Sequence, residues 1–423
     1  MENIYLCIDL KSFYASVECV ERGLDPMTTN LVVADPERSE KTICLAVSPS
    51  MKALGVKNRC RVFEIPDTIK YIMAPPRMQK YIDYAARIYE IYLKYVSSDD
   101  VYVYSIDEAF LDVTHYLKSM GLTARQLAVK IMDDIYTNVG VRATCGIGTN
   151  LYLTKIALDI TAKHSKDFIG YLDEELFIKT LWDHQPLTDF WRIGKGTAEK
   201  LERMGIYTMR HIAQMDEDIL YRAFGVDAEL LIDHSRGIEP VTMADIKAYK
   251  PKSNCLTSGQ VLGCSYAFED AKLAVREMMD SLCLDMTRKG LVTSSVTLHV
   301  GYDNKYKMAP AHGTARIGRD TNNAAYIMPE VLNLFDGIVD RDFLVKRINI
   351  TCNNVIEDDG SMQISLFDKV TDEKDQKIQQ LMNDIKDRFG KNTILKATSL
   401  EETSTAMERN LLIGGHKSGN EKK

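Results

Sequence analysis

The sequence lacks long apolar runs, a signal-peptide start and paired cysteines. No apolar stretch approaches the ~18 residues of a membrane-spanning helix, and Met1-Glu2-Asn3 has no basic residue that would begin a signal peptide. The nine cysteines are odd in number and never form a Cys-x-x-Cys pair, which argues against a disulfide framework and against a structural zinc site. We expect a cytoplasmic protein with reduced, mostly buried thiols and no membrane partner.

An excess of basic residues is also missing. The chain has 53 lysines and arginines against 60 aspartates and glutamates, a net charge of −7, which taken alone argues against a nucleic-acid partner. The average conceals a local difference, because residues 246–320 contain eleven basic and seven acidic side chains. A basic face can therefore exist on an acidic protein.

Apolar and charged residues occur at ordinary globular levels. Hydrophobic residues make up 45% of the 423-residue chain and charged residues 27%, which argues against wholesale disorder and against a fibrous architecture. A chain of this length has room for roughly two to four domains.

Strand-like and helix-like segments alternate in the first part of the chain. Residues 3–9 have the apolar pattern of a buried strand, and residues 12–20 that of a short helix capped by Ser12. Residues 101–113 form a candidate hairpin with two acidic residues at its centre. Together with a strand at 141–147 and helices at 77–95, 123–136 and 151–160, they predict an α+β sheet backed by helices.

The second part of the chain is helical at first and then mixed. Residues 174–237 have helical spacing with short connections marked by glycine. From about residue 254 a strand, a helix at 268–289, two strands, a second helix and a last strand fit a split βαββαβ unit. Beyond residue 353 the sequence is polar, so we expect a flexible tail with one helix-like stretch at 372–389.

Three carboxylates stand where strands end or turn. Asp9 ends the first strand, and Asp107 with Glu108 lies at the centre of the hairpin. Transfer of a phosphoryl group to a hydroxyl uses two Mg²⁺ ions about 3.5 to 4 Å apart, held by a few carboxylates and the substrate phosphates. Spacing alone also allows an ordinary interpretation, in which Asp9 is an acid near a helix start and the other two occupy a solvated turn.

A resemblance decides between these interpretations. Ile-Asp-Leu-Lys-Ser-Phe-Tyr-Ala-Ser-Val-Glu at 8–18 and Tyr-Ser-Ile-Asp-Glu-Ala-Phe-Leu-Asp at 104–112 resemble the two defining motifs of Y-family DNA polymerases. The resemblance continues through 145–157 and 193–201 and, more weakly, to about residue 351. Among the UmuC-like and DinB-like branches, the chain is most similar to an UmuC-like, ultraviolet-damage repair subgroup.

The resemblance implies a right-hand polymerase that copies DNA past damaged bases. It implies these parts: a palm at 1–10 and 78–168, small fingers at 11–77, a helical thumb with a helix-hairpin-helix at 169–238, a βαββαβ little finger at 246–352, and the tail at 353–423. By the same similarity, Asp9 and Asp107 bridge two Mg²⁺ ions and Leu10 adds a backbone carbonyl. Glu108 binds the metal that activates the primer 3′-hydroxyl.

The deoxynucleoside triphosphate needs a pocket that fits its sugar and neutralises its charge. Phe13 and Tyr14 follow the first acid, and the resemblance makes Tyr14 the candidate steric gate against a ribose 2′-hydroxyl. Lys163 aligns with a family lysine that contacts the triphosphate, and Lys155 lies about two helical turns earlier. A packed tyrosine and solvated lysines are the ordinary alternatives.

The fingers depart from the family pattern. Where the DinB-like branch has a tyrosine and an arginine that touch the phosphates, this sequence has Pro49 and Lys52. Lys52 supplies charge but not the bidentate geometry of arginine.

Primer-template DNA is the implied macromolecular substrate. The turn at Gly194, Lys195 and Gly196 resembles a helix-hairpin-helix, in which backbone N–H groups approach a phosphate, although a tight helix connection explains it equally well. The remaining phosphate-contact candidates are the basic residues of the little finger: Lys247, Lys250, Lys252, Arg316 and Arg319.

An apolar cluster interrupts the polar tail and suggests a protein partner. The cluster Gln363, Ile364, Ser365, Leu366 and Phe367 resembles the pentapeptide with which bacterial polymerases bind the sliding clamp. Leu366 and Phe367 would anchor it in an apolar groove. We expect a monomeric core. Two other interpretations stay open at this stage: a nucleotidyl cyclase with a palm fold, and a non-catalytic scaffold that keeps the polymerase shape.

Overall fold

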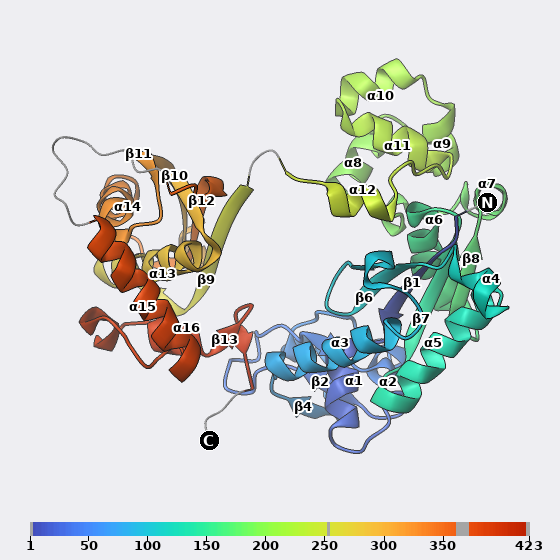
Figure 1. Cartoon of the computed structure of the whole chain (residues 1–423), viewed down its shortest axis with the longest axis horizontal. Helices are drawn as coiled ribbons and strands as arrows, with labels where there is room; N and C mark the ends of the chain where they lie inside the picture. The colour runs from blue at the N-terminus through green and yellow to red at the C-terminus, as the bar shows by residue number, and fades with distance from the viewer. Residues whose placement is uncertain (1–2, 252–253, 361–371, 420–423) are drawn as a thin grey trace. The chain divides into compact units, whose positions relative to one another are not determined.

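The computed structural model describes residues 3–251, 254–360 and 372–419. The chain divides into two compact units, Met1–Tyr249 with Ser418–Lys423, and Lys250–Lys417 (Figure 1). The expected α+β class is confirmed, because each unit combines a sheet with packed helices. Within the described ranges, no helix is both long enough and apolar enough to cross a membrane.

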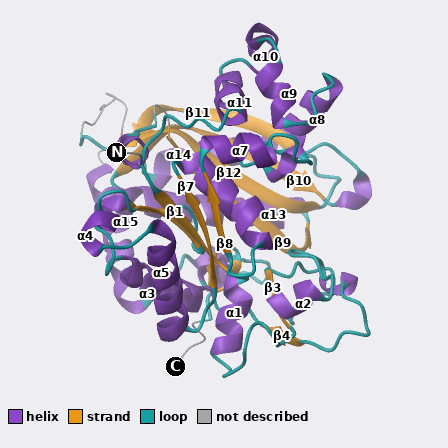
Figure 2. Cartoon of the chain, turned by 90° about the vertical axis from the view of Figure 1, so that its right-hand side faces the viewer, coloured by secondary structure: helices purple, strands orange, loops and turns teal. Residues whose placement is uncertain are grey.

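A five-stranded sheet forms the centre of the first unit. Its strand order is β5-β6-β1-β7-β8, antiparallel except for the β7–β8 pair. The predicted hairpin is present, since β5 and β6 pair around a four-residue loop. The helices α3 and α5 lie side by side along this sheet (Figures 1 and 2). The elements are β1 (Tyr5–Leu10), α3 (Met78–Tyr92), β5 (Val101–Val103), β6 (Glu108–Asp112), α4 (Tyr116–Met120), α5 (Ala124–Val139), β7 (Ala143–Gly148), α6 (Leu151–Ile156) and β8 (Ile169–Leu172).

A second, three-stranded sheet carries its own small core. Its order is β3-β2-β4, and apolar side chains around Val32, Val47 and Met51 are buried between this sheet and the helix α2. Ser48 caps α2 by accepting a hydrogen bond from the Met51 N–H, and Pro49 occupies the first helical position, where no N–H is needed. The elements are α1 (Phe13–Val20), β2 (Leu31–Val33), β3 (Ala46–Val47), α2 (Pro49–Ala53) and β4 (Ile72–Ala74).

Short helices around an apolar core complete the first unit. Asp173, Thr208 and Asp216 cap three of them through their side chains, which explains why this polar stretch is helical. The helices are α7 (Glu174–Leu181), α8 (Lys195–Arg203), α9 (Met209–Gln214), α10 (Glu217–Phe224), α11 (Asp227–Ser235) and α12 (Met243–Ala248).

The second unit has the expected βαββαβ order. Its sheet runs β11-β10-β12-β9, and α13 and α14 cover one face of it over a core that includes Val296, Leu298 and Ile350 (Figure 1). The other face carries mostly polar side chains. The elements are β9 (Asn254–Tyr266), α13 (Phe268–Lys289), β10 (Leu291–Tyr302), β11 (Ala311–Thr321), α14 (Ala324–Ile338) and β12 (Val345–Glu357).

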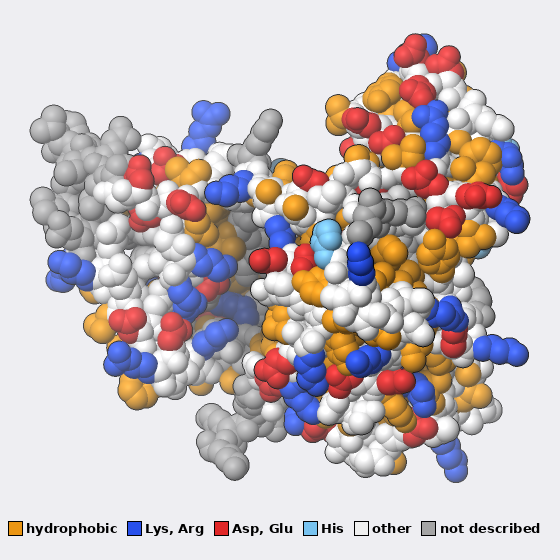
Figure 3. Space-filling model, turned by 45° about the vertical axis from the view of Figure 1, so that its right-hand side comes forward, with side chains coloured by type: hydrophobic (Ala, Val, Ile, Leu, Met, Phe, Trp, Pro, Cys, Tyr) orange, Lys and Arg blue, Asp and Glu red, His pale blue; other side chains and the backbone are white. Residues whose placement is uncertain are grey.

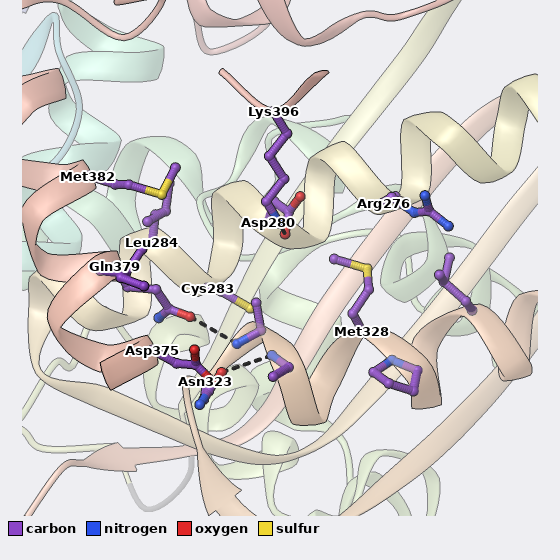
Figure 4. A pocket seen from close by; sticks show the side chains of 15 residues that line it. Arg276, Asp280, Cys283, Leu284, Asn323, Met328, Asp375, Gln379, Met382 and Lys396 are labelled. Carbon is purple, nitrogen blue, oxygen red and sulfur yellow. Dashed lines mark hydrogen bonds and ion pairs between the residues drawn. The ribbon is translucent and has the colours of Figure 1, made fainter. Parts of the chain in front are cut away.

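The prediction of a flexible tail over 353–423 is wrong for most of its length. The strand β12 continues to Glu357, and the segment after residue 371 packs on α13 and α14. The Gln379 side chain accepts a hydrogen bond from the Ala324 N–H at 3.0 Å, beside a pocket of about 450 Å³ lined by apolar side chains of the three helices (Figure 4). The elements are α15 (Asp372–Phe389), α16 (Ala406–Asn410), β13 (Leu412–Ile413) and β14 (His416–Lys417).

A buried carboxylate explains how a polar segment becomes ordered here. Glu277 on α13 is 4% exposed and accepts hydrogen bonds from the Ser404 hydroxyl and from the N–H and hydroxyl of Thr405. Such charge-assisted hydrogen bonds can order a segment that has no apolar stripe. Apolar periodicity in the sequence therefore does not predict this structure.

Candidate active site

The three acidic residues meet at the edge where β1 and β6 pair. Asp9 lies directly opposite Glu108 in the antiparallel register. Asp107 is the last residue of the hairpin loop, where the Leu10 N–H donates to its carbonyl at 2.9 Å and the Ser105 hydroxyl donates to its carboxylate at 2.6 Å. The loop thus frees Asp107 from strand alternation, as required if adjacent residues are to serve one site.

The cluster concentrates negative charge in a partly buried place, since Glu108 is buried and Asp9 and Asp107 are half-buried. Burial, followed by the neighbouring carboxylates of Asp107 and Glu108, raises the pKa of Asp9 from 3.8 to about 7. A divalent cation would relieve this repulsion, and carboxylate and carbonyl oxygens are the ligands that Mg²⁺ prefers. Asp9, Asp107, Glu108 and the Leu10 carbonyl therefore fit a divalent metal by their chemistry.

The side chains of the three acids are not arranged as a complete set of metal ligands in this structure. Across residues 3–251, 254–360 and 372–419, no three His, Cys, Asp or Glu side chains group closely enough to hold a metal ion. The two carboxylate oxygens of Glu108 instead accept hydrogen bonds from the Lys155 ammonium at 2.8 and 2.9 Å. Lys155, expected at the triphosphate, is thus 7% exposed and bonded to a proposed metal ligand.

The helix α1 begins three residues after Leu10 through an unusual backbone turn. Ser12 has left-handed dihedral angles (φ 49°, ψ 46°), and its side chain forms no capping hydrogen bond, contrary to the expected cap. Phe13 is buried. The half-buried Tyr14 ring stacks on Tyr81 of α3 at 4.4 Å between centroids. Burial, with a further contribution from Asp107, raises the pKa of Tyr14, so Tyr14 and Asp107 interact electrostatically.

A buried ion-pair network that the sequence did not reveal fastens α1 to α3. Glu18 is 0% exposed and accepts hydrogen bonds from Arg77 Nε at 2.9 Å, Arg77 Nη2 at 2.7 Å and the Tyr81 hydroxyl at 2.8 Å. Arg22 also bonds to Glu18. Because Tyr81 contacts both Glu18 and the Tyr14 ring, the network helps to fix the position of Tyr14 beside the acids. The only sequence signal was a glutamate on an apolar helix.

Lysines from three segments interact electrostatically with Asp9. Burial lowers the pKa of Lys11 and of Lys52, while Asp9 opposes both shifts. Lys11 was not predicted, and its ammonium lies 3.9 Å from the centre of the Phe168 ring. Lys163 is exposed and bonds to Asp159 at 3.1 Å. Positive charge therefore acts on the acids from Lys11 before α1, from Lys52 on α2 and from Lys163 after α6.

A cavity of about 410 Å³ opens between α3 and the hairpin. Asp107 and Glu108 line it together with apolar side chains of α3 that include Ile82, Ala85 and Tyr89. The acids thus border a space with a largely apolar wall.

The glycine-rich turn of the first unit is exposed. Gly194, Lys195 and Gly196 open α8, with Gly194 in the N-cap position and no side-chain cap. Only a three-residue 3₁₀ turn, Leu187–Asp189, precedes it closely, so the first helix of the expected helix-hairpin-helix is short. The N–H groups of the first turn face no capping side chain.

The second unit starts four residues after residue 246, where the predicted little finger begins. Lys247 lies on α12 in the first unit, and its ammonium donates to the carbonyls of Ser98 and Asp99. The second unit begins at Lys250, which is exposed. Lys247 is therefore committed to a structural contact, while Lys252 lies outside the described residues.

The polar sheet face of the second unit presents one of the two predicted arginines. Arg316 is exposed, and the register places it beside Ser295, which in turn pairs with Asn353. Arg319 stacks on the Tyr326 ring at 4.2 Å. The predicted clamp-binding cluster, Gln363, Ile364, Ser365, Leu366 and Phe367, lies outside the described residues.

Comparison with known proteins settles the family. Residues 8–159 match the model of the impB/mucB/samB family, and residues 261–366 match the model of its C-terminal domain. The chain belongs to the impB/mucB/samB family. The resemblance to UmuC-like and DinB-like Y-family proteins is thereby confirmed.

Curated relatives match this family member over nearly their whole length. UvrX of Bacillus subtilis, which is named for UV-damage repair, is 32% identical over 98% of this chain and 97% of its own length. DNA polymerase IV 2 of the same organism is 30% identical over 98% and 99%. A solved Y-family DNA polymerase chimera has a TM-score of 0.66 with 20% identity, and the match covers 84% of this chain and 99% of the chimera, which shows the shared fold.

Proposed function

We propose that this chain is a DNA-directed DNA polymerase that performs translesion synthesis by two-metal nucleotidyl transfer. The observation that carries the proposal is the meeting of Asp9, Asp107 and Glu108 at the β1–β6 edge in a member of the impB/mucB/samB family. Relatives named as DNA polymerase IV and as a UV-damage repair protein support both the activity and the role.

The acidic residues would hold the metal ions of the reaction. Two Mg²⁺ ions would supply the charge that activates the primer 3′-hydroxyl and stabilises the triphosphate. Asp9 and Asp107 would bridge the ions, with the Leu10 carbonyl as a further ligand, and Glu108 would hold the ion at the primer end. The raised pKa of Asp9, caused first by burial and then by the charges of Asp107 and Glu108, supports this assignment because a bound cation would favour the charged carboxylate.

The incoming deoxynucleotide would lie between α1 and the lysines around Asp9. Tyr14, held by its stacking on Tyr81, would exclude a ribose 2′-hydroxyl, and Phe13 would support it from the core. Lys52 and Lys163 would pair with the triphosphate. The uncapped first turn of α1 adds N–H groups suited to a phosphate.

Primer-template DNA would be bound mainly through its phosphates. Gly194, Lys195 and Gly196 open a helix whose free N–H groups suit a phosphate. In the second unit, Arg316 and Lys250 would contact the backbone, with Arg319 beside them. Acidic and basic side chains are interspersed elsewhere on the surface (Figure 3), so DNA binding depends on local patches and not on net charge.

The bacterial sliding clamp is the proposed protein partner. The pentapeptide at 363–367 supports it by its sequence alone. We further propose a monomeric core.

Primer extension in Mg²⁺ tests the proposed function. A cyclase would form a cyclic nucleotide without a primer, and a scaffold would bind DNA without extending it. Extension of an undamaged primer-template that requires all three acids, together with insertion opposite a defined ultraviolet lesion, supports translesion synthesis. Binding without extension refutes it.

A further inference from the structure

Lys155 is a buried cation in direct contact with the acid cluster. Its side chain is 8% exposed, and its ammonium lies 2.8 Å from Glu108 Oε1 and 2.9 Å from Oε2. The same ammonium lies 3.0 Å from Asp159 Oδ2, and Cys7 Sγ lies 3.2 Å from Glu108 Oε1. Both Glu108 oxygens that a metal ion would use are therefore hydrogen-bonded inside the protein.

Asp159 offers the ammonium a second place on the same helical segment. Asp159 lies one turn after Lys155, within a π-helical turn, Ala157–Thr161, that follows α6. Such turns are rare and often occur at functional sites. The Asp159 side chain is 24% exposed, so its charge costs less to bury than that of Glu108, at 9%. It also bonds to Lys163, and thus links Lys155 to a proposed triphosphate contact.

The buried pair has a clear electrostatic consequence. Burial opposes the charge of Lys155, yet Asp159 and Glu108 outweigh it and raise its pKa, so the ammonium stays charged. Glu108 raises the pKa of Asp9 and Lys155 lowers it, so this buried cation offsets part of the repulsion between the two carboxylates. A metal ion that binds Glu108 competes with this ammonium, because both Glu108 oxygens already accept hydrogen bonds from Lys155 and the two cations repel each other at this distance.

We propose that Lys155 is an internal stand-in for the metal ion: it holds Glu108 in the metal-free protein, and when metal binds it releases Glu108 and keeps its ion pair with Asp159 alone. Lys155 is then a positioning residue that sets the metal affinity of the site, and Asp159 is its acceptor. This inference rests on the proposed function, since it takes Glu108 to be a metal ligand.

Binding of Mn²⁺ to the DNA-free protein tests the exchange without measuring activity. Mn²⁺ accepts the same oxygen ligands as Mg²⁺, and its free fraction is read directly by electron paramagnetic resonance. In Lys155→Met the competing cation is gone, so Mn²⁺ should bind roughly tenfold more tightly. Addition of Mn²⁺ should also raise the melting temperature of this variant more than that of the parent.

A second variant should change Mn²⁺ binding in the opposite direction. In Asp159→Asn the ammonium loses its charged acceptor and stays on Glu108, so Mn²⁺ should bind roughly tenfold more weakly. Loss of packing alone would weaken binding in both variants, whereas the exchange predicts opposite signs. Lys94→Met removes a remote surface pair with Asp134 and should leave Mn²⁺ affinity unchanged.

The outcomes separate the inference from the proposed function. If Glu108→Gln leaves Mn²⁺ binding unchanged, Glu108 is not a metal ligand and the proposed site fails. If Glu108→Gln weakens binding but Lys155→Met does not tighten it, the site stands and the exchange is refuted. If Lys155→Met does not fold, Asp159→Asn decides alone, and an affinity equal to that of the parent refutes the exchange.

Discussion

Replacement of Arg77 by alanine tests how strongly the buried ion-pair network around Glu18, which fastens α1 to α3, stabilises the first unit. Arg77 donates two hydrogen bonds to the fully buried Glu18 and is itself 28% exposed. Removal of one partner of a buried pair costs about 3 to 5 kcal/mol, because a charge is left uncompensated. Arg22 and Tyr81 still bond to Glu18, so we expect the lower end, about 3 kcal/mol.

Urea unfolding followed by tryptophan fluorescence measures this loss of stability in the first of the two compact units. Both tryptophans, Trp182 and Trp191, belong to the first unit, so the signal does not include unfolding of the second. The matched control is Arg203→Ala, whose pair with Glu199 is exposed and 3.9 Å long, and which should change stability by about 0 to 1 kcal/mol.

The cost should also depend on pH in a defined direction. Although burial alone would raise it, hydrogen bonds from Arg77, Arg22 and Tyr81 lower the pKa of Glu18 below its usual 4.5 in the folded protein. The stability from this group is therefore present above pH 4.5 and is lost as the pH falls through the folded-state pKa. Without Arg77, Glu18 binds a proton more readily, so the deficit should be smaller at about pH 4 than at about pH 7. An equal deficit at both pH values, or a variant as stable as the parent, would refute the reasoning.

Three further predictions concern the nucleotide, the C-terminal segment and the clamp. Tyr14→Ala should admit ribonucleotides while deoxynucleotide use changes little, and unchanged sugar discrimination would place the gate elsewhere. Glu277→Ala should speed amide hydrogen exchange at residues 397–413, whereas the exposed control Glu269→Ala should not; equal protection would mean that other contacts hold the segment. Replacing Leu366 and Phe367 by alanine should reduce clamp affinity by about 2 kcal/mol or more per anchor, with clamp-free extension intact. Equal affinity in calorimetry would reject the motif.

Local patterns predicted the sheet of the first unit and the order of the second. Strand runs around Asp9 and the hairpin with Glu108 have strong periodicity, and the helix at 268–289 was located to the residue. The sequence located the acids at the ends of strands. The pairing of β1 with β6 brings these strand ends together.

Contacts between distant segments could not be predicted in the same way. The pair of Lys155 with Glu108 joins residues 47 positions apart, and a lysine on an apolar helix gives no sign of its partner. Glu277 similarly orders a segment more than a hundred residues away, which polar composition alone suggested to be flexible. Lys247 was predicted to contact a phosphate because the sequence shows its charge but not the distant backbone carbonyl to which it donates.

Primer extension by Asp107→Ala and Glu108→Ala tests the central claim most directly. Both variants should bind primer-template DNA nearly as well as the parent, because phosphate contacts dominate affinity, yet neither should extend the primer. Asp112→Ala is the matched control, since Asp112 ends the same strand opposite Tyr5 and away from Asp9. Loss of extension in the first two variants alone is the predicted result. Substantial extension by either of them would contradict the assignment of these acids to catalysis.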